Sequence, residues 1–506
     1  MLFCLRNRVQ CFLLEGILMN RESGILMPVA SLPSRFGIGG FGKESYRFVD
    51  LLEKGGYHLW QILPLNPLGY GHSPYQPFSS FAIDDLYTDL DDLKRRGFLK
   101  EVPSFPGDTS KIRYEEIREW MKPYLEEAYQ NAKEKEKSNI AAFMATYSWA
   151  KGWGLFMFYK RKNSLRSWNE WPKEEQDRIN LLDALTEEEK EGVSYEVWLQ
   201  MNLYREWKAL RAYANRKGIR LIGDVPFYVG YDSCDVWSNL DTFEIDPVTK
   251  EPIWIAGVPP DYFCATGQRW GNPIYKWDLL AKNGFSFIIN RLKGNAELYD
   301  VVRLDHFRAF DTYWRIPASC PTAIDGKWIE APGYAFFDTF FKEVKNVEII
   351  AEDLGSLRPE VLTLRDHYHL PGMNVVEFTF RDAEIEHKQD VSNPNMVVYL
   401  GTHDNEPFKG FFERQNDWEK NAWRETLRQK GFMSDDPCEA IREYALSLPA
   451  NYAIFAMQDI LELGNEARLN EPSTINDFNW TWRLNDFDKF SSLLPSLKAL
   501  NKKYHR

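Results

Sequence analysis

Short apolar runs alternate with amphipathic helical patterns along this chain. Eight of the runs have the length and the β-branched or aromatic content of strands buried on both faces. They lie at Gly24–Ala30, His58–Leu63, Arg220–Val225, Val301–Leu304, Val347–Ala351, Asn374–Phe380, Met396–Leu400 and Tyr452–Met457. The pattern predicts eight parallel strands.

Helical patterns that stop at glycine fill the intervals between these runs. Their apolar faces include Phe48, Leu51 and Leu52 before Gly55, and Leu203, Trp207, Leu210 and Ala214 before Gly218. Eight alternating strands and helices predict an α/β protein built on a closed (β/α)8 TIM barrel, with functional residues at the C-terminal ends of the strands. An open, doubly wound sheet is the alternative that this pattern leaves.

Two intervals exceed the roughly 30 residues of one barrel repeat. Residues 86–205 read as an inserted helical subdomain, and residues 230–284, rich in Trp, Pro and Gly, as a loop-rich insertion at the same rim. We therefore expect a single catalytic domain over residues 19–506. Residues 1–18 precede the first pattern, and charged residues interrupt their apolar stretch. We interpret them as a dispensable extension or a misplaced start rather than a signal peptide.

Composition narrows the class of protein. The 506 residues carry a net charge of −12 without a dense Lys/Arg cluster, which excludes nucleic acid and anionic membrane as partners. Six scattered cysteines show neither a CxxC pair nor zinc spacing, which indicates reduced thiols and a cytoplasmic location. No HExxH motif, P-loop or dinucleotide fingerprint is present, so no cofactor and no metal are expected.

Polar residues follow four of the predicted strands. Asp224 ends one strand, and Arg303 and Asp305 share one face of the next because side chains alternate along a strand. The Arg303 guanidinium should keep Asp305 deprotonated at neutral pH, the state that a nucleophile requires. Glu352 stands where an apolar run stops, so burial and neighbouring carboxylates should raise its pKa and suit it to act as a general acid.

The fourth strand end carries His403 and Asp404, a pair suited to hydrogen bonds with sugar hydroxyls. Retaining cleavage of a glycosidic bond requires one ionised and one protonated carboxyl about 5–5.5 Å apart, a geometry that adjacent strand ends provide. Any one of these residues alone is more simply explained as a helix N-cap. Four such strand ends together favour a site.

Three sequences at these strand ends, RLDHFRA, AEDLG and GTHDN, closely resemble the catalytic motifs of the 4-α-glucanotransferases of glycoside hydrolase family 77. These enzymes, also called amylomaltase or disproportionating enzyme, belong to the α-amylase superfamily. The resemblance extends from about Ser23 to Leu484. It includes SLPSRFGIG, LPLNPLGYGHSPYQP, GDVPFYV, GQRWGNPIYKWD, MQDILELGNEAR and NWTWR.

By position, this resemblance implies Asp305 as nucleophile, Glu352 as acid/base and Asp404 as the group that stabilises the transition state. It implies substrate contacts from Asp224, Arg303 and His403, and sugar-binding positions at Ser73, Tyr75, Gln268, Trp270 and Asn272. The loop that carries the last three is then expected to arch over the cleft as a lid. Packing and an ordered connection are the simpler alternatives for these outer residues.

Several positions depart from the family pattern: Met27-Pro28-Val29, Glu377 and Glu406-Pro407. We expect them to line or support subsites beside the catalytic centre. Trp168 and Trp171 are interpreted as core residues rather than a remote glucan-binding surface. The acidic run from Asp84 to Asp92 lacks the spacing of a calcium loop and is interpreted as a solvated turn.

The predicted reaction is transfer of an α-1,4-glucan segment to the 4-hydroxyl of glucose or another glucan, with α-1,4-glucans and maltooligosaccharides as partners. A hydrolase of the same fold is the nearest alternative. A non-catalytic glucan-binding protein and a metal-dependent barrel enzyme are the others.

Overall fold

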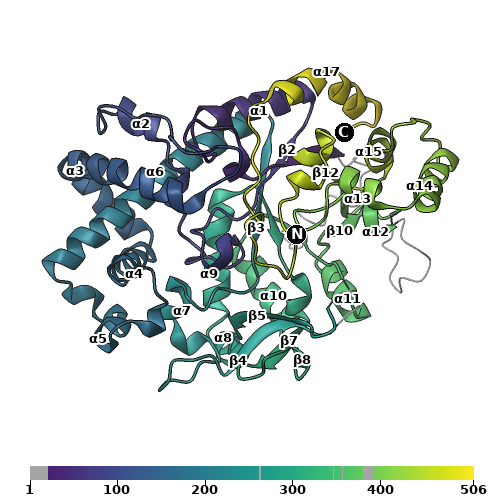
Figure 1. Ribbon diagram of the computed structural model, residues 1–506. Coiled ribbons are helices and arrows are strands. Elements are labelled where there is room, and N and C mark those ends of the chain that lie inside the picture. The colour runs from purple at the N-terminus through teal and green to yellow at the C-terminus, as the bar shows by residue number, and fades with distance from the viewer. Residues whose placement is uncertain (1–20, 261–263, 346, 356, 380–390) are drawn as a thin grey trace, which may run out of the picture.

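The computed structural model describes residues 21–260, 264–345, 347–355, 357–379 and 391–506 (Figure 1). The predictions for residues 1–18 and for Phe380 lie outside this part of the chain. Within it, no helix is long and apolar enough to cross a membrane.

The centre of the molecule is a parallel sheet of eight strands in the order β10-β11-β12-β1-β2-β3-β6-β9. The backbone N–H of Ala351, in β9, donates to the carbonyl of Pro371, directly before β10, at 2.9 Å and joins the two ends of the sheet. This arrangement confirms the predicted TIM barrel. The strands are β1 (Glu22–Leu26), β2 (Leu59–Gln61), β3 (Arg220–Val225), β6 (Val301–Leu304), β9 (Glu348–Ala351), β10 (Gly372–Val375), β11 (Met396–Tyr399) and β12 (Tyr452–Ala456).

The largest differences between predicted and observed strands lie after β1 and β10. β1 ends at Leu26, and a 3-10 helix, η2 (Val29–Ser31), follows Pro28, which has no N–H for a strand ladder. β10 ends at Val375, and the apolar run continues as α12 (Val376–Thr379). Buried residues continue past the end of both strands, so the apolar pattern overestimated the length of each strand.

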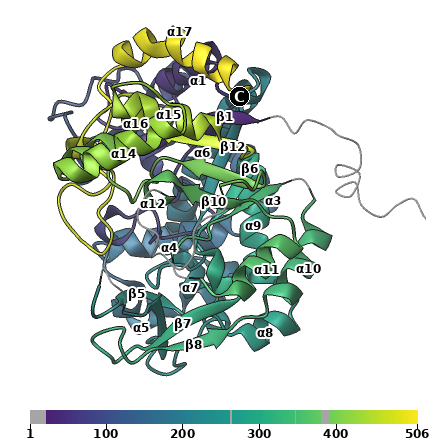
Figure 2. The ribbon, with the colours of Figure 1, turned by 90° about the vertical axis from the view of Figure 1, so that its right-hand side faces the viewer.

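Helices surround the barrel (Figures 1 and 2). α1 and α17 pack against each other at the top of both views. α13, α14 and α15 lie together at the right of Figure 1. Besides α12, the helices outside the first insertion are α1 (Lys43–Gly55), α7 (Cys234–Trp237), α8 (Trp277–Lys282), α9 (Ser286–Leu298), α10 (Gly333–Glu343), α11 (Pro359–His367), α13 (Phe408–Arg414), α14 (Asp417–Gln429), α15 (Pro437–Ser447), α16 (Met457–Ile460) and α17 (Asp488–Lys503).

Most of the chain between β2 and β3 is helical. It contains α2 (Leu90–Arg95), α3 (Tyr114–Thr146), α4 (Ala150–Lys162), α5 (Lys173–Gln176) and α6 (Glu187–Arg216). A capping box between Thr186 and Glu189 starts α6, which packs along both α3 and α4. Trp168 and Trp171 are 0% and 3% exposed, which confirms that they are core residues.

Residues 230–284 are more ordered than their composition predicts. They contain β4 (Trp254–Val258) and β5 (Gln268–Pro273), an antiparallel pair within a four-stranded sheet, β5-β4-β7-β8. The other two strands are β7 (Thr312–Pro317) and β8 (Lys327–Glu330), which follow β6 in the chain. Backbone bonds to β7, a distant partner, stabilise β4 as a strand, which the composition of this insertion did not indicate.

The acidic run is not a solvated turn throughout. Asp84 is 1% exposed, and the guanidinium of Arg118 lies 3.1 Å from both of its carboxylate oxygens. The N–H groups of Leu68 and Leu86 also donate to Asp84. A buried carboxylate requires such partners. The run therefore joins the barrel rim to the inserted helices.

One carboxyl beside this run should destabilise the protein at neutral pH. Burial, with the charges of nearby aspartates, raises the pKa of Glu206 from its ordinary 4.5 to about 8. Between these values the unfolded chain releases a proton that the folded chain keeps, so this group's contribution to stability falls as pH rises from 4.5 to about 8. Glu206→Gln keeps an acceptor for the N–H of Asp89. We expect it to raise the melting temperature at pH 7.5 by about 2–4 °C.

Calorimetry at two pH values tests this expectation. The gain should shrink as the pH falls towards 4.5 and vanish below that value, where both states of the wild type become protonated. Glu188→Gln, an exposed change on the same helix, should leave the melting temperature unchanged. A variant at Glu206 that melts at or below the wild-type temperature at pH 7.5 would show that ionisation of this group is not costly.

Candidate active site

The interior of the barrel changes from apolar to polar along the strands. Val301 and Arg303 of β6 face inward, and Asp305, directly after β6, continues this series because alternate residues of a strand share a face. On the neighbouring β3, Ile222 is followed by Asp224. Ile350 of β9 is followed by Glu352, directly after that strand. The apolar members of these series belong to one buried cluster. Polar groups thus replace that cluster at the C-terminal mouth, where TIM barrels carry their chemistry.

A buried arginine links two of these carboxylates. Arg303 pairs with Asp224 across β3 and β6 and places Nη1 at 2.8 and 2.7 Å from its two oxygens. The same nitrogen donates to Oδ1 of Asp305 at 3.0 Å. The side chain of Asp224 is 0% exposed and that of Asp305 is 27% exposed. Arg303 therefore fixes the carboxylate of Asp305 at the mouth of the barrel.

The pKa of Asp305 depends on burial as well as on Arg303. Burial raises this pKa to about 6, and the charge of Arg303 opposes the rise. The charge of Asp224 acts in the same direction as burial. This pKa agrees with the prediction that Asp305 is deprotonated at neutral pH, although the sequence showed the arginine and not the burial. The ionised form still predominates at pH 7.

Glu352 lies opposite Asp305 on the adjacent strand end. Leu304 pairs with Ala351, and the N–H of Glu352 continues the ladder to the carbonyl of Leu304 at 3.0 Å. Neighbouring strands are about 4.8 Å apart, so Asp305 and Glu352 follow two adjacent strands side by side at the barrel mouth. Retaining chemistry uses two such neighbouring carboxyls.

The carboxyl of Glu352 is held by backbone donors. Oε2 accepts the N–H of His306 at 2.8 Å, and Oε1 accepts the N–H of Leu354 at 3.0 Å. His306 has a φ of 52°, an uncommon backbone conformation for a residue with a side chain. Burial raises the pKa of Glu352 to about 7, against Arg303 and these two donors and with the charge of Asp305. The predicted rise is confirmed.

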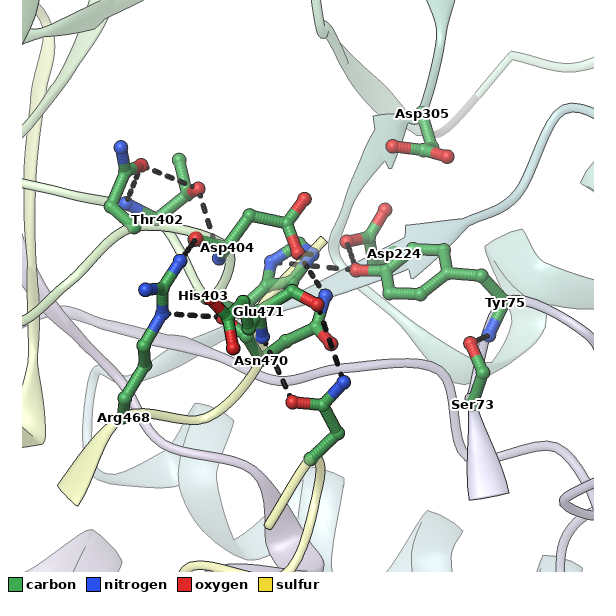
Figure 3. Close-up of polar contacts among 12 residues, drawn as sticks. Ser73, Tyr75, Asp224, Asp305, Thr402, His403, Asp404, Arg468, Asn470 and Glu471 are labelled. Carbon is green, nitrogen blue, oxygen red and sulfur yellow. Dashed lines mark hydrogen bonds and ion pairs between the residues drawn. The ribbon is translucent and has the colours of Figure 1, made fainter. Parts of the chain in front are cut away.

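His403 and Asp404 follow β11 and lie across the mouth from Asp305 (Figure 3). The ring of His403 stacks on Tyr75 at 5.1 Å and 16°, and the Tyr75 hydroxyl donates to Asp224 at 2.8 Å. Nε2 of His403 lies 3.4 Å from Oδ1 of Asp404. Tyr75 thus connects the two sides of the site.

Two residues near Asp404 were not predicted. The amide of Asn470 donates to Oδ1 of Asp404 at 2.7 Å, and the guanidinium of Arg468 donates to its main-chain carbonyl at 3.0 Å (Figure 3). Both lie in the segment after β12, where no periodic pattern distinguishes them. Only the family-like sequence GNEAR, which ends at Arg468, could have indicated this segment.

The outer predicted residues fall into two groups. Trp270 lies edge-on to the ring of His306, with centroids 4.8 Å apart, and its indole N–H donates to Gln268 at 3.1 Å. This contact brings β5 close to the end of β6. Ser73 accepts the N–H of Tyr75 at 3.2 Å and so shapes the turn that presents the tyrosine.

Asn272 is not placed where a sugar could reach it. It is 3% exposed, its amide nitrogen donates to the carbonyl of Val229 at 2.8 Å, and its oxygen accepts from Gln76 at 3.0 Å. The expectation of a direct sugar contact is therefore corrected. Because its polar atoms are already bonded, Asn272 instead fastens β5 to the barrel rim.

The positions that depart from the family pattern support the rim. Met27 and Val29 are 0% and 2% exposed and pack in the core, so they cannot line a subsite. Glu377 accepts from the amide of Asn405 at 3.2 Å, and Glu406 accepts from Asn465 at 2.8 Å. Both glutamates thus hold the loop around His403 and Asp404.

Comparison with known proteins identifies the family. The family 77 profile, described as 4-alpha-glucanotransferase, matches residues 27–489. The 4-alpha-glucanotransferase of Thermus thermophilus is 40% identical over 482 residues, covering 92% of this chain and 95% of that protein. That of Clostridium butyricum is 39% identical over 498 residues, covering 95% and 100%.

A solved structure agrees with this assignment. The amylomaltase from Streptococcus agalactiae in complex with acarbose matches with a TM-score of 0.89 and 34% identity, covering 96% of this chain and 99% of that one. The sequence match and the shared architecture extend over nearly the whole chain. This chain therefore belongs to the 4-α-glucanotransferase family of glycoside hydrolase family 77.

Proposed function

We propose that this 4-α-glucanotransferase transfers a segment of an α-1,4-glucan to the 4-hydroxyl of glucose or another glucan by double displacement with retention. The observation that carries the proposal is the pairing of Asp305 and Glu352 at adjacent strand ends. One carboxyl is largely ionised near neutral pH and the other retains a proton up to about pH 7. Retaining chemistry needs this combination.

In the first step, a carboxylate oxygen of Asp305 attacks the anomeric carbon. The bond from that carbon to the leaving glycosidic oxygen breaks, and Glu352 donates its proton to this oxygen. The product is a glycosyl ester on Asp305 and a shortened glucan. Arg303 orients the attacking carboxylate through its bond to Oδ1.

In the second step, Glu352 removes the proton of the acceptor's 4-hydroxyl. That oxygen attacks the anomeric carbon, and the ester bond to Asp305 breaks, which restores both carboxyls. The net stereochemistry is retained because the carbon is inverted twice. No external oxidant, reductant or cofactor enters this balance.

Asp404 is assigned to the sugar hydroxyls beside the reacting carbon. Its side chain is 47% exposed and is oriented by Asn470, so an oxygen can face a bound sugar. His403 and Tyr75 form a stacked pair beside it, and Asp224 accepts the tyrosine hydroxyl. Trp270, Gln268 and Ser73 are proposed to frame the cleft. A cytoplasmic location stays a prediction.

The products formed from maltotriose test the reaction. Transfer should give glucose and a ladder of longer oligomers while the total number of reducing ends stays constant, because each cleaved bond is replaced. Chromatography of the oligomers and a reducing-end assay measure both quantities in one sample. A steady rise in reducing ends would instead identify a hydrolase, in which water resolves the glycosyl ester.

A further inference from the structure

A groove with a cavity volume of about 720 Å³ lies on the flank of the molecule. It is lined by the turn between α3 and α4 and by residues of α4, α7 and α9, which lie near one another in Figure 1. None of the residues that line it belongs to the candidate active site. We call this cavity the flank groove.

Aromatic rings form part of its wall. Phe81, Tyr147, Trp149 and Phe287 line the groove, and each is partly exposed. Trp149 stacks on Phe81 at 5.9 Å and 17°, so the phenylalanine fixes the plane of the indole. A rigid ring with an electron-rich face is a suitable surface for the C–H face of a pyranose.

Neutral polar side chains stand at the edge of the same groove. Asn180, Asn283 and Asn290 are exposed there, and the described structure contains no hydrogen bond from their side-chain amides. An amide both donates and accepts, as a sugar hydroxyl does. The lining contains no cluster of cations that would favour a phosphate or another anion.

One residue of the groove wall carries a buried donor without an acceptor. Trp153 lines the groove and is 2% exposed, yet its indole N–H has no acceptor among the described residues. Buried donors are normally satisfied by protein, water or ligand. Gly294, also in the lining, leaves space that a side chain would fill, because a Cβ there would lie 3.2 Å from the Phe81 ring.

We propose that the flank groove binds a segment of an α-1,4-glucan at a distance from the catalytic carboxyls. Ring surfaces combined with uncharged donors and acceptors match a neutral polyhydroxylated chain. The identity of this glucan rests on the proposed function. A long polymer held at two places on one protein binds more tightly than a short one, because the second contact becomes intramolecular.

Binding to glycogen in native gels tests the proposal in the full-length Asp305→Asn protein, which cannot turn over the polymer. Trp149→Ala removes the main ring, and Asn290→Arg places a long side chain in the groove without removing a core residue. Each should weaken apparent affinity for glycogen about tenfold. Trp418→Ala and Asn421→Arg, exposed changes of the same kinds on α14, are the matched controls and should have no effect.

The same four changes are then made with Asp305 intact, and transfer from maltotriose is measured. The proposal expects maltotriose kinetics within twofold of the parent for all of them, since a trisaccharide is too short to span both places. Unchanged glycogen affinity in both groove variants would overturn it. The proposal would also be overturned if the groove variants lost transfer activity with maltotriose by the same factor as they lost affinity for glycogen. If the parent protein itself fails to transfer from maltotriose, the proposed function fails, whatever the gels show.

Discussion

Asp305→Asn should lower kcat for transfer from maltotriose by roughly 10⁴-fold or more, because the amide oxygen cannot serve as the nucleophile that forms the glycosyl ester. The amide has nearly the size of the carboxylate, and its oxygen can still accept from Arg303. Glucan affinity should therefore change little. Steady-state kinetics and calorimetric titration with a maltooligosaccharide measure the two effects separately.

Two further variants serve as controls for this result. Asp305→Ala should be equally inactive, which rules out recovery through deamidation of the asparagine. Asp241→Asn, an exposed aspartate on η7 (Leu240–Thr242), should behave as the wild type. Activity within tenfold of wild type in either Asp305 variant would remove the nucleophile assignment.

Removing the acid/base should produce a loss that depends on the leaving group. Glu352→Ala should lower kcat with maltotriose by about 10²–10⁴-fold, because the leaving oxygen is no longer protonated. Fluoride departs without a proton, so an α-maltosyl fluoride should still glycosylate Asp305. We expect a rapid release of fluoride, about one per protein, followed by slow turnover because deprotonation of the acceptor is also lost.

Stopped-flow measurement of fluoride tests this expectation, with Glu360→Ala, exposed on α11, as the control. If fluoride release falls as far as the maltotriose rate, Glu352 does not act on the leaving group. Added azide, which needs no deprotonation, should restore turnover in Glu352→Ala.

The pH dependence of kcat/KM in the wild type should reflect the ionisation of both Asp305 and Glu352. kcat/KM should rise with pH through about 6, as Asp305 loses its proton, and fall through about 7, as Glu352 loses the proton that it must donate. The falling limb should be absent in Glu352→Ala.

The barrel and the core of the site could be predicted from the sequence because both depend on local patterns. A strand buried on both faces must be apolar, and the chain then shows a change to polar residues where the strand reaches the barrel mouth. Asp224, Arg303, Asp305 and Glu352 were identified in this way. Strand ends were less predictable: the apolar run at Val375 continues in α12 because a buried helix requires the same residue types.

Features that depend on distant partners could not be predicted. β4 is a strand because it pairs with β7, which follows the barrel strand β6 in the sequence. Asn470 likewise contacts Asp404 from 66 residues away in the sequence. Asn272 looked like a sugar ligand in a loop, but Gln76 and Val229 already bond its amide. To predict the pKa of Asp305, the effect of burial must be weighed against the charge of Arg303. The degree of burial is known only once the chain is folded.

The most direct test of the mechanism is to identify the carboxylate that becomes glycosylated. An α-maltotriosyl fluoride that lacks the 4-hydroxyl on its terminal sugar can donate but cannot accept, so the glycosyl ester should accumulate. After an acid quench and proteolysis, mass spectrometry should find the added sugar mass on the peptide that contains Asp305, and on no peptide of Asp305→Asn. An adduct on Glu352 or Asp404, or none while fluoride is released, would contradict the mechanism.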